Sequence, residues 1–470
     1  MDFSDSNSQL WGALIQLCYL CTIILIANVL RRKISFLGKT LLPTSVIGGF
    51  LLMAIRESGL ITINLQFMES LVYHLTAIGF IALSLRVTDF KGYGEDKGIN
   101  SSGVKSGIVI VSSYLIQGII GLLITVTLAK TIMPDLFEAS GILLAMGFGQ
   151  GPGQANNVGN IYAGLGFVGG ASFGLAISAV GLLWACFGGI IYLSRLVSGN
   201  KVALLGRISS TVVTSEQIES EEEIPLTEAV DKFTIQVALV LMVYLATYFL
   251  SVLLTRGIAQ AEFFGTLKNT LIPLIWGFNF LTGSILATSL GNLFLKFRKS
   301  GVMTHQYQNN YMLNRISGIA FDFMVTAAIG SIAIGDLKRL WLPLILVTTA
   351  GGFITFFYLI FISKKVYKNY HYEGFFSMFG MMTGTVSTGV MLLREIDPNF
   401  KTPAANNLVL GSTSAILLGF PLLILIGLAP RSTEMLFLSI FIMIGYLILL
   451  NAFIIKDDII KWIKGNSWKN

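Results

Sequence analysis

Apolar segments about 20 residues long follow one another along almost the whole chain, and this is the length a helix needs to cross a bilayer. Only 12% of the 470 residues are charged, against about 25% in soluble domains, and the mean hydropathy is +0.75. The sequence therefore predicts an all-α polytopic membrane protein. The thirteen segments are 10–30, 36–56, 69–88, 104–130, 138–165, 170–195, 231–254, 268–295, 314–335, 340–363, 374–394, 404–428 and 433–455.

The charged residues and the termini exclude several classes of protein. The net charge of +7 comes from basic residues in short loops at helix ends, which is typical of membrane topology and predicts no nucleic-acid partner. The acidic N-terminus lacks the basic region of a secretory signal, so we expect the first apolar run to be a retained helix. No metal-ligand spacing and no nucleophile with its base occurs in the sequence. We expect no enzyme, no cofactor and no metal other than a coupling ion.

Segment 146–160 is polar although it lies between two apolar runs. Its sequence is MGFGQGPGQANNVGN, with Pro152, two Gln and three Asn. Lipid offers no hydrogen bonds to such groups, so we expect protein to shield the segment or the segment to line a wet cavity. Segment 374–394 is the second unusual one, because Gly, Ser and Thr interrupt it. Broken helices of this kind hold ions and small solutes in transporters.

Loop charges indicate how these two segments enter the membrane. If both are re-entrant and the N-terminus is outside, 25 of the 32 Lys and Arg residues are cytoplasmic and seven are outside. If the first segment spanned fully, the inside count would fall to 13 against 19. The positive-inside rule favours the first topology. We therefore expect about 11 full transmembrane helices plus two re-entrant hairpins, with a cytoplasmic C-terminus.

This topology divides the chain into two halves of opposite orientation, which is an inverted repeat. The hairpins are expected near 138–165 and near 374–394. The expected domains are a first repeat at 1–195, a polar cytoplasmic linker at 196–230, a second repeat at 231–428, and an extra transmembrane helix with a C-terminal tail at 429–470.

Hairpins that enter from opposite faces should meet near the midplane and form a site there. Sodium favours the carbonyl and side-chain oxygens they carry, and helix N-termini beside them favour a carboxylate. For a single Thr, close helix packing is the alternative explanation. The candidate substrate-binding residues are Gln150, Gln154, Asn156, Asn157, Thr385, Ser387, Thr388 and Arg394, and the candidate sodium-binding residues are Gly149, Gly151, Asp322, Thr383 and Gly384.

The two charged candidates keep structural alternatives. Asp322 stands in an apolar run, where a lone carboxylate is costly and is a functional candidate by default. A pair with Arg315, seven residues earlier, is the alternative. Arg394 could bind a substrate carboxylate bidentately, or it could pair with Glu395 or Asp397 at the cytoplasmic surface.

Several stretches in a fixed order resemble the bacterial sodium/glutamate symporter family. They are LPTSVIGGF at 42–50, IALSLR at 81–86, the Gly-rich segment 146–160, IAFDF at 319–323 and TGVMLLR at 388–394, followed by Asp397 and Pro398. The resemblance spans roughly residues 10–428. One departure is GQGPGQ at 149–154, where glutamate-associated hairpins of the family carry a Gly-Gly-His-Gly-Thr type of motif.

The resemblance implies sodium-driven uptake of glutamate or a related acidic amino acid by alternating access. It further implies a homodimer in the bacterial cytoplasmic (inner) membrane, with sodium as the coupling ion and a small anionic solute as cargo. Two alternatives remain at this stage. One is a sodium-coupled carrier of another carboxylate, and the other is an ion channel that uses the hairpins as a filter.

Overall fold

The structure is a computed structural model, in which every regular element of the described chain is a helix. Of the predicted linker 196–230, residue 200 and residues 202–230 lie outside the described part. The described residues are 4, 7–34, 37, 42–87, 97–199, 201, 231–261, 265, 268–303, 305–397 and 402–466.

Nine helices in these ranges are long and apolar enough to cross a membrane, or ten if the bent pair at 410–431 forms one span. This confirms the predicted all-α polytopic membrane protein. Two of the predicted eleven full spans are not among the nine. The described part of the predicted span 36–56 contains a helix of 14 residues, and the predicted span 404–428 contains the bent pair. The predicted span 268–295 is represented among the nine by residues 279–299, and its helix is interrupted at Phe278, where φ is −109° and ψ is 34°.

The helices form two compact units, and each predicted repeat contributes helices to both. Unit 1 contains α1 (Ser8–Lys33), α3 (Thr44–Glu57), α4 (Leu65–Ser84), α10 (Lys232–Gln260), α11 (Lys268–Gly277), α12 (Asn279–Lys299) and α13 (Asn310–Gly330). Unit 2 contains α5 (Lys97–Thr131), η2 (Glu138–Ile142), η3 (Ala145–Gln150), α6 (Pro152–Ala163), α7 (Gly170–Leu183), η4 (Trp184–Gly188), α8 (Gly189–Ser198), α14 (Ile334–Leu337), α15 (Trp341–Val366), α16 (His371–Thr383), α17 (Val386–Arg394), α18 (Ala404–Leu418), α19 (Phe420–Leu428), η6 (Ala429–Arg431) and α20 (Thr433–Asn466).

In unit 1, α4 packs against α12 and α13, and α3 packs against α13. The fit is close at glycine: a Cβ on Gly79 would lie 2.6 Å from the ring of Phe321. Ile81 of α4 belongs to a buried apolar cluster with Val243 and Leu313. These contacts join helices from both halves of the sequence into one unit.

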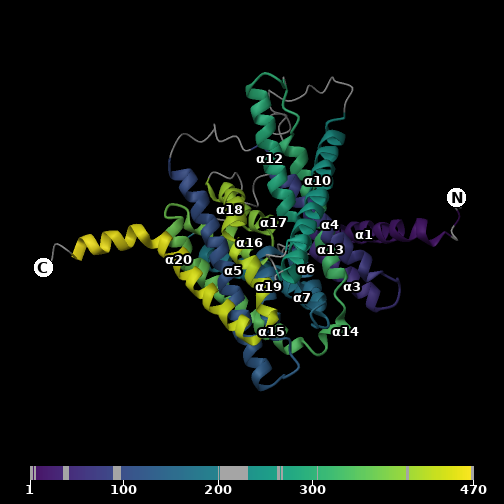
Figure 1. The fold of residues 1–470 in the computed structure, drawn as a ribbon, viewed down its shortest axis with the longest axis horizontal. Helices are drawn as coiled ribbons and strands as arrows, with labels where there is room; N and C mark the ends of the chain where they lie inside the picture. Colours follow the sequence, from purple (N-terminus) through teal and green to yellow (C-terminus); the bar gives the residue numbers. More distant parts are fainter. Residues whose placement is uncertain are drawn as a thin grey trace. The chain divides into compact units, whose positions relative to one another are not determined.

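In unit 2, small residues bring helix backbones into direct contact. Gly121 of α5 touches the backbone of Gly141 in η2, so that neither position has room for a side chain. Gly107 of α5 packs in the same way against Ser414 of α18. Figure 1 shows α5 and α18 side by side. Such close approach is how membrane helices gain packing contacts where no hydrophobic driving force exists between them.

The first prediction concerns the contact between Gly121 and Gly141. Gly121→Leu is expected to destabilise the protein by at least about 1–3 kcal/mol, the usual effect of overpacking, because the added side chain meets the backbone of η2. Thermal unfolding of the detergent-solubilised protein measures this. Gly445→Leu on α20 is the matched control, since nothing lies within 4 Å of a Cβ there. Equal unfolding temperatures for the two variants would contradict the prediction.

Candidate functional site

The chain between α5 and α7 is a helix interrupted at Gly151, and we call residues 138–163 the first broken segment. The π-helix η3 ends at Gly151, whose φ of 93° is a conformation that glycine adopts readily. Pro152 then starts α6. A π-helix beside a break is a feature that recurs at functional sites. We call Gly151 and its neighbours the first tip.

The two ends of the first broken segment lie together. The ring of Phe137, just before η2, lies 5.4 Å from the ring of Tyr162 and 5.2 Å from the ring of Phe167. Tyr162 Oη also donates a 2.8 Å hydrogen bond to the carbonyl of Ile426. The chain therefore reverses its direction at Gly151, so that the end of the segment at Tyr162 lies beside its beginning at Phe137.

Residues 371–394, the second broken segment, turn back in the same way. Helix α16 ends at Gly384, and Thr385 caps the start of α17. The two helices run side by side in opposite directions: a Cβ on Gly380 would lie 2.7 Å from Cα of Gly389. Gly384 and Thr385 form the second tip.

The two tips meet inside unit 2. A Cβ on Gly151 would lie 3.6 Å from the carbonyl oxygen of Gly384 and 3.9 Å from Cγ2 of Thr385. Gly181 of α7 touches the carbonyl of Thr383. Residues more than 200 positions apart in the sequence therefore form a single site. At this site η3 and α16 end, and α6 and α17 begin.

Gln117 of α5 lies at the same place, and sequence reasoning missed it. Its Nε2 donates hydrogen bonds to the carbonyl of Met382, at 2.8 Å, and to Oγ1 of Thr355, at 3.0 Å. The side chain is fully buried, yet its Oε1 has no hydrogen-bond partner. An amide side chain within the apolar run 104–130 was the signal in the sequence that could have pointed to it.

The predicted amides of the first broken segment are largely buried. Gln154 is 1% exposed, and its Nε2 has no hydrogen-bond partner. Asn156 and Asn157 are also buried, and Asn156 accepts a 3.3 Å hydrogen bond from Asn160. Gln150 is half-buried at the end of η3. Unsatisfied buried donors such as Gln154 Nε2 are rare in native proteins and point to a missing partner.

The predicted hydroxyls of the second tip stabilise its turn. Thr385 Oγ1 accepts a 3.2 Å hydrogen bond from the amide of Thr388 and lies 3.0 Å from the Thr388 hydroxyl. Thr383 Oγ1 donates to the carbonyl of Phe379 at 2.7 Å. These contacts are helix capping and helix back-bonding, and each oxygen retains a further lone pair. The side chain of Ser387 lies outside the described residues.

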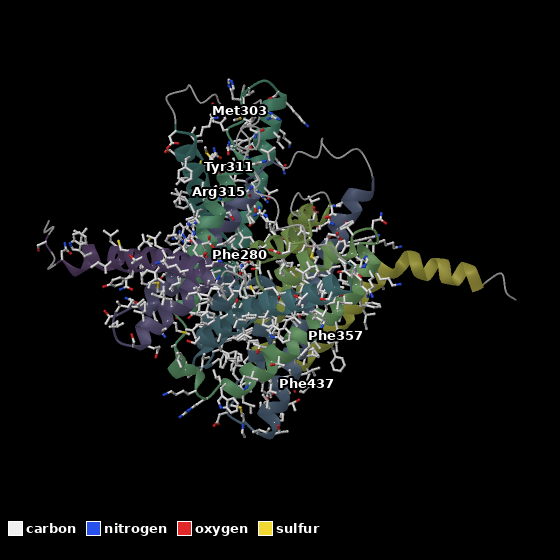
Figure 2. All side chains as sticks on the ribbon, turned by 180° about the vertical axis from the view of Figure 1, so that it is seen from behind. Phe280, Met303, Tyr311, Arg315, Phe357 and Phe437 are labelled. Atoms are coloured by element: carbon white, nitrogen blue, oxygen red, sulfur yellow. The ribbon has the colours of Figure 1, made fainter. Side chains whose placement is uncertain are left out.

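Of the two charged candidates, only Arg394 belongs to unit 2 with the tips. Asp322 belongs to unit 1, where its side chain bonds to Ser45. No ion pair between Asp322 and Arg315 occurs among the described residues; Arg315 donates a 3.1 Å hydrogen bond to the hydroxyl of Tyr311, and both residues are labelled in Figure 2. Arg394 is exposed in the last turn of α17, which at 1.5 Å per residue places it about 14 Å from the tip.

The electrostatics of the tips come from neutral groups. Among the described Lys and Arg side chains of unit 2, all are exposed except half-buried Lys105. Helices η3 and α16 end at the tips, and α6 and α17 begin there. Helix ends carry free carbonyls that favour a cation, and helix starts carry free N–H groups that favour an anion. The described residues include no group of three or more His, Cys, Asp or Glu that could hold a metal ion.

No protein-family model, curated protein or solved structure matches this chain. The candidate site is therefore defined by its own geometry, in which two helix breaks and the buried Gln117 come together.

The second prediction concerns the cap of α17. Thr385→Val removes the hydroxyl that accepts from the Thr388 amide and is expected to destabilise the second tip by about 1 kcal/mol. Hydrogen exchange at residues 386–389 measures the local loss of protection. Thr385→Ser keeps the hydroxyl and is expected to exchange like the wild type. Equal protection in the valine and serine variants would show that the cap does not stabilise the tip.

Proposed function

We propose that this protein is a secondary active transporter that carries a small anionic solute together with sodium. The observation that carries the proposal is the meeting of the two tips, with Gly151 against Gly384 and Thr385 in one unit. A site made of two broken helices supplies both carbonyl oxygens for a hard cation and N–H groups for a carboxylate. Close packing of helices by itself does not require two helix breaks to meet.

The directions of the helices support a re-entrant, inverted arrangement. Helices α5 and α18 run parallel, because Gly103 packs on Leu410 and Gly107 packs on Ser414. The first broken segment follows the end of α5, and the second precedes the start of α18. The two segments therefore enter unit 2 from opposite ends, as two re-entrant hairpins of an inverted repeat would.

A second pair of helices is also parallel. Helix α15 precedes the second broken segment, and it runs parallel to η4 and α8, which follow the first broken segment. Trp184 of η4 packs on Phe353, with ring centroids 5.0 Å apart, and Tyr192 of α8 packs on Phe356 at 5.2 Å. Each half therefore uses the same order of a helix, a broken segment and a helix, with opposite directions.

In the proposed mechanism sodium binds at the carbonyl ends of η3 and α16. The solute carboxylate binds at the starts of α6 and α17, where Gln154 Nε2 donates to it. Since both tips belong to unit 2, movement of this unit as one body would expose the loaded site to alternate faces of the membrane. Glutamate or a related acidic amino acid is the solute that the family resemblance suggests.

The third prediction tests transport directly. Purified protein in liposomes is expected to take up radiolabelled glutamate, aspartate or a dicarboxylate when an inward sodium gradient is imposed. An equal potassium gradient is expected to give only background uptake, because sodium supplies the work. Absence of sodium-driven uptake for every one of these solutes would refute the proposal, and conductance without saturation would favour a channel.

The fourth prediction concerns Gln154. Gln154→Ala removes the unpartnered donor at the start of α6 and is expected to raise the KM for the solute about tenfold, since a lost hydrogen bond to a charged group is worth about 1.5–3 kcal/mol. Uptake kinetics at saturating sodium measure this. Gln66→Ala is the matched control, because Gln66 is an exposed glutamine of unit 1. A wild-type KM for Gln154→Ala would place the solute elsewhere.

A further inference from the structure

The orientation of the Gln117 amide follows from its neighbours. The carbonyl of Met382 can only accept a hydrogen bond, so the NH₂ group of Gln117 must face it. Thr355 Oγ1 takes the second hydrogen of the same NH₂ group. The amide oxygen consequently points the opposite way and is not free to exchange places with the nitrogen.

The amide oxygen faces the first broken segment. A Cβ on Gly149 would lie 3.0 Å from Gln117 Oε1, and the same Cβ would clash with the ring of Tyr114. Only glycine fits here, so the backbone of η3 approaches Gln117 closely just before the break at Gly151. Oε1 is buried, lacks a hydrogen-bond donor, and lies where η3 ends and its last carbonyls have no partner within the helix.

We infer that Gln117 Oε1 is a ligand for the coupling sodium ion, shared with backbone carbonyls at the end of η3. The inference deepens the proposed transport function and rests on it. A buried oxygen without a donor is costly, and a hard cation satisfies it in the way that a hydrogen bond would. The ligand is neutral, which agrees with the neutral groups at both tips.

This placement would also connect sodium binding to the second tip. A cation at Oε1 polarises the amide and strengthens the hydrogen bonds that its NH₂ group donates. One of these bonds holds the carbonyl of Met382, two residues before Gly384. Sodium on the side of the first tip would thus stabilise the second tip, and the order of binding would be sodium first and solute second.

The fifth prediction uses sodium alone as the probe. Radioactive sodium binding to the purified full-length protein is measured at constant ionic strength, with choline chloride as the balancing salt. Gln117→Met keeps the length of the side chain and removes the oxygen, and it is expected to raise the half-saturating sodium concentration about tenfold or more. Gln117→Asn, which retracts the amide by one methylene, is expected to weaken binding as well and is measured where the methionine variant does not fold.

Thr355→Val is the matched control, because it removes one acceptor of the NH₂ group and leaves Oε1 in place. It is expected to bind sodium like the wild type. If the Gln117 variants bind sodium as the wild type does, or if Thr355→Val loses binding equally, Gln117 is not the ligand, and the transport proposal stands. If the wild type itself neither binds sodium nor shows sodium-driven uptake, the proposed function fails and the inference with it.

Discussion

A broken backbone inside an apolar bundle must find hydrogen-bond partners within the protein, and unit 2 is organised around this constraint. The breaks at Gly151 and Gly384 interrupt helices whose surroundings are otherwise apolar. Ser178 Oγ donates a 2.7 Å hydrogen bond to the carbonyl of Gly147, and Gln117 donates to the carbonyl of Met382 near the other break. Each break is therefore supported by a side chain from a neighbouring helix.

Glycine contacts make this support possible, because they bring the neighbouring helices close enough. Gly121 and Gly141 touch through their backbones, and Gly380 and Gly389 do so within the second broken segment. The same close packing joins helices from distant parts of the sequence, as Gly107 and Ser414 show. Both broken segments thereby belong to one unit, which is the condition for a shared site.

The sequence allowed both interrupted segments to be anticipated, because Gly, Pro and amide side chains stand out against an apolar background, and it left open whether segment 146–160 is shielded by protein or lines a wet cavity. Asp322 stood out for the same reason, and the structure places it in unit 1. The sequence could not show this, because a charge in an apolar run says nothing about which helices surround it. Gln117 was missed because its partner Met382 is 265 residues away. A single amide within an apolar run marks an unusual polar group, but it does not say which distant residue the group contacts.

The sequence by itself determined the all-α membrane fold and the two segments in which the helices break, because length, hydropathy and backbone chemistry are local properties. Only the tertiary structure decided that the breaks meet, that Gln117 stands beside them, and that Arg394 lies at the far end of α17 from the second tip. These relations depend on helix directions and on close glycine contacts between distant residues. Packing geometry of this kind is a property of helix pairs and cannot be read from either helix alone.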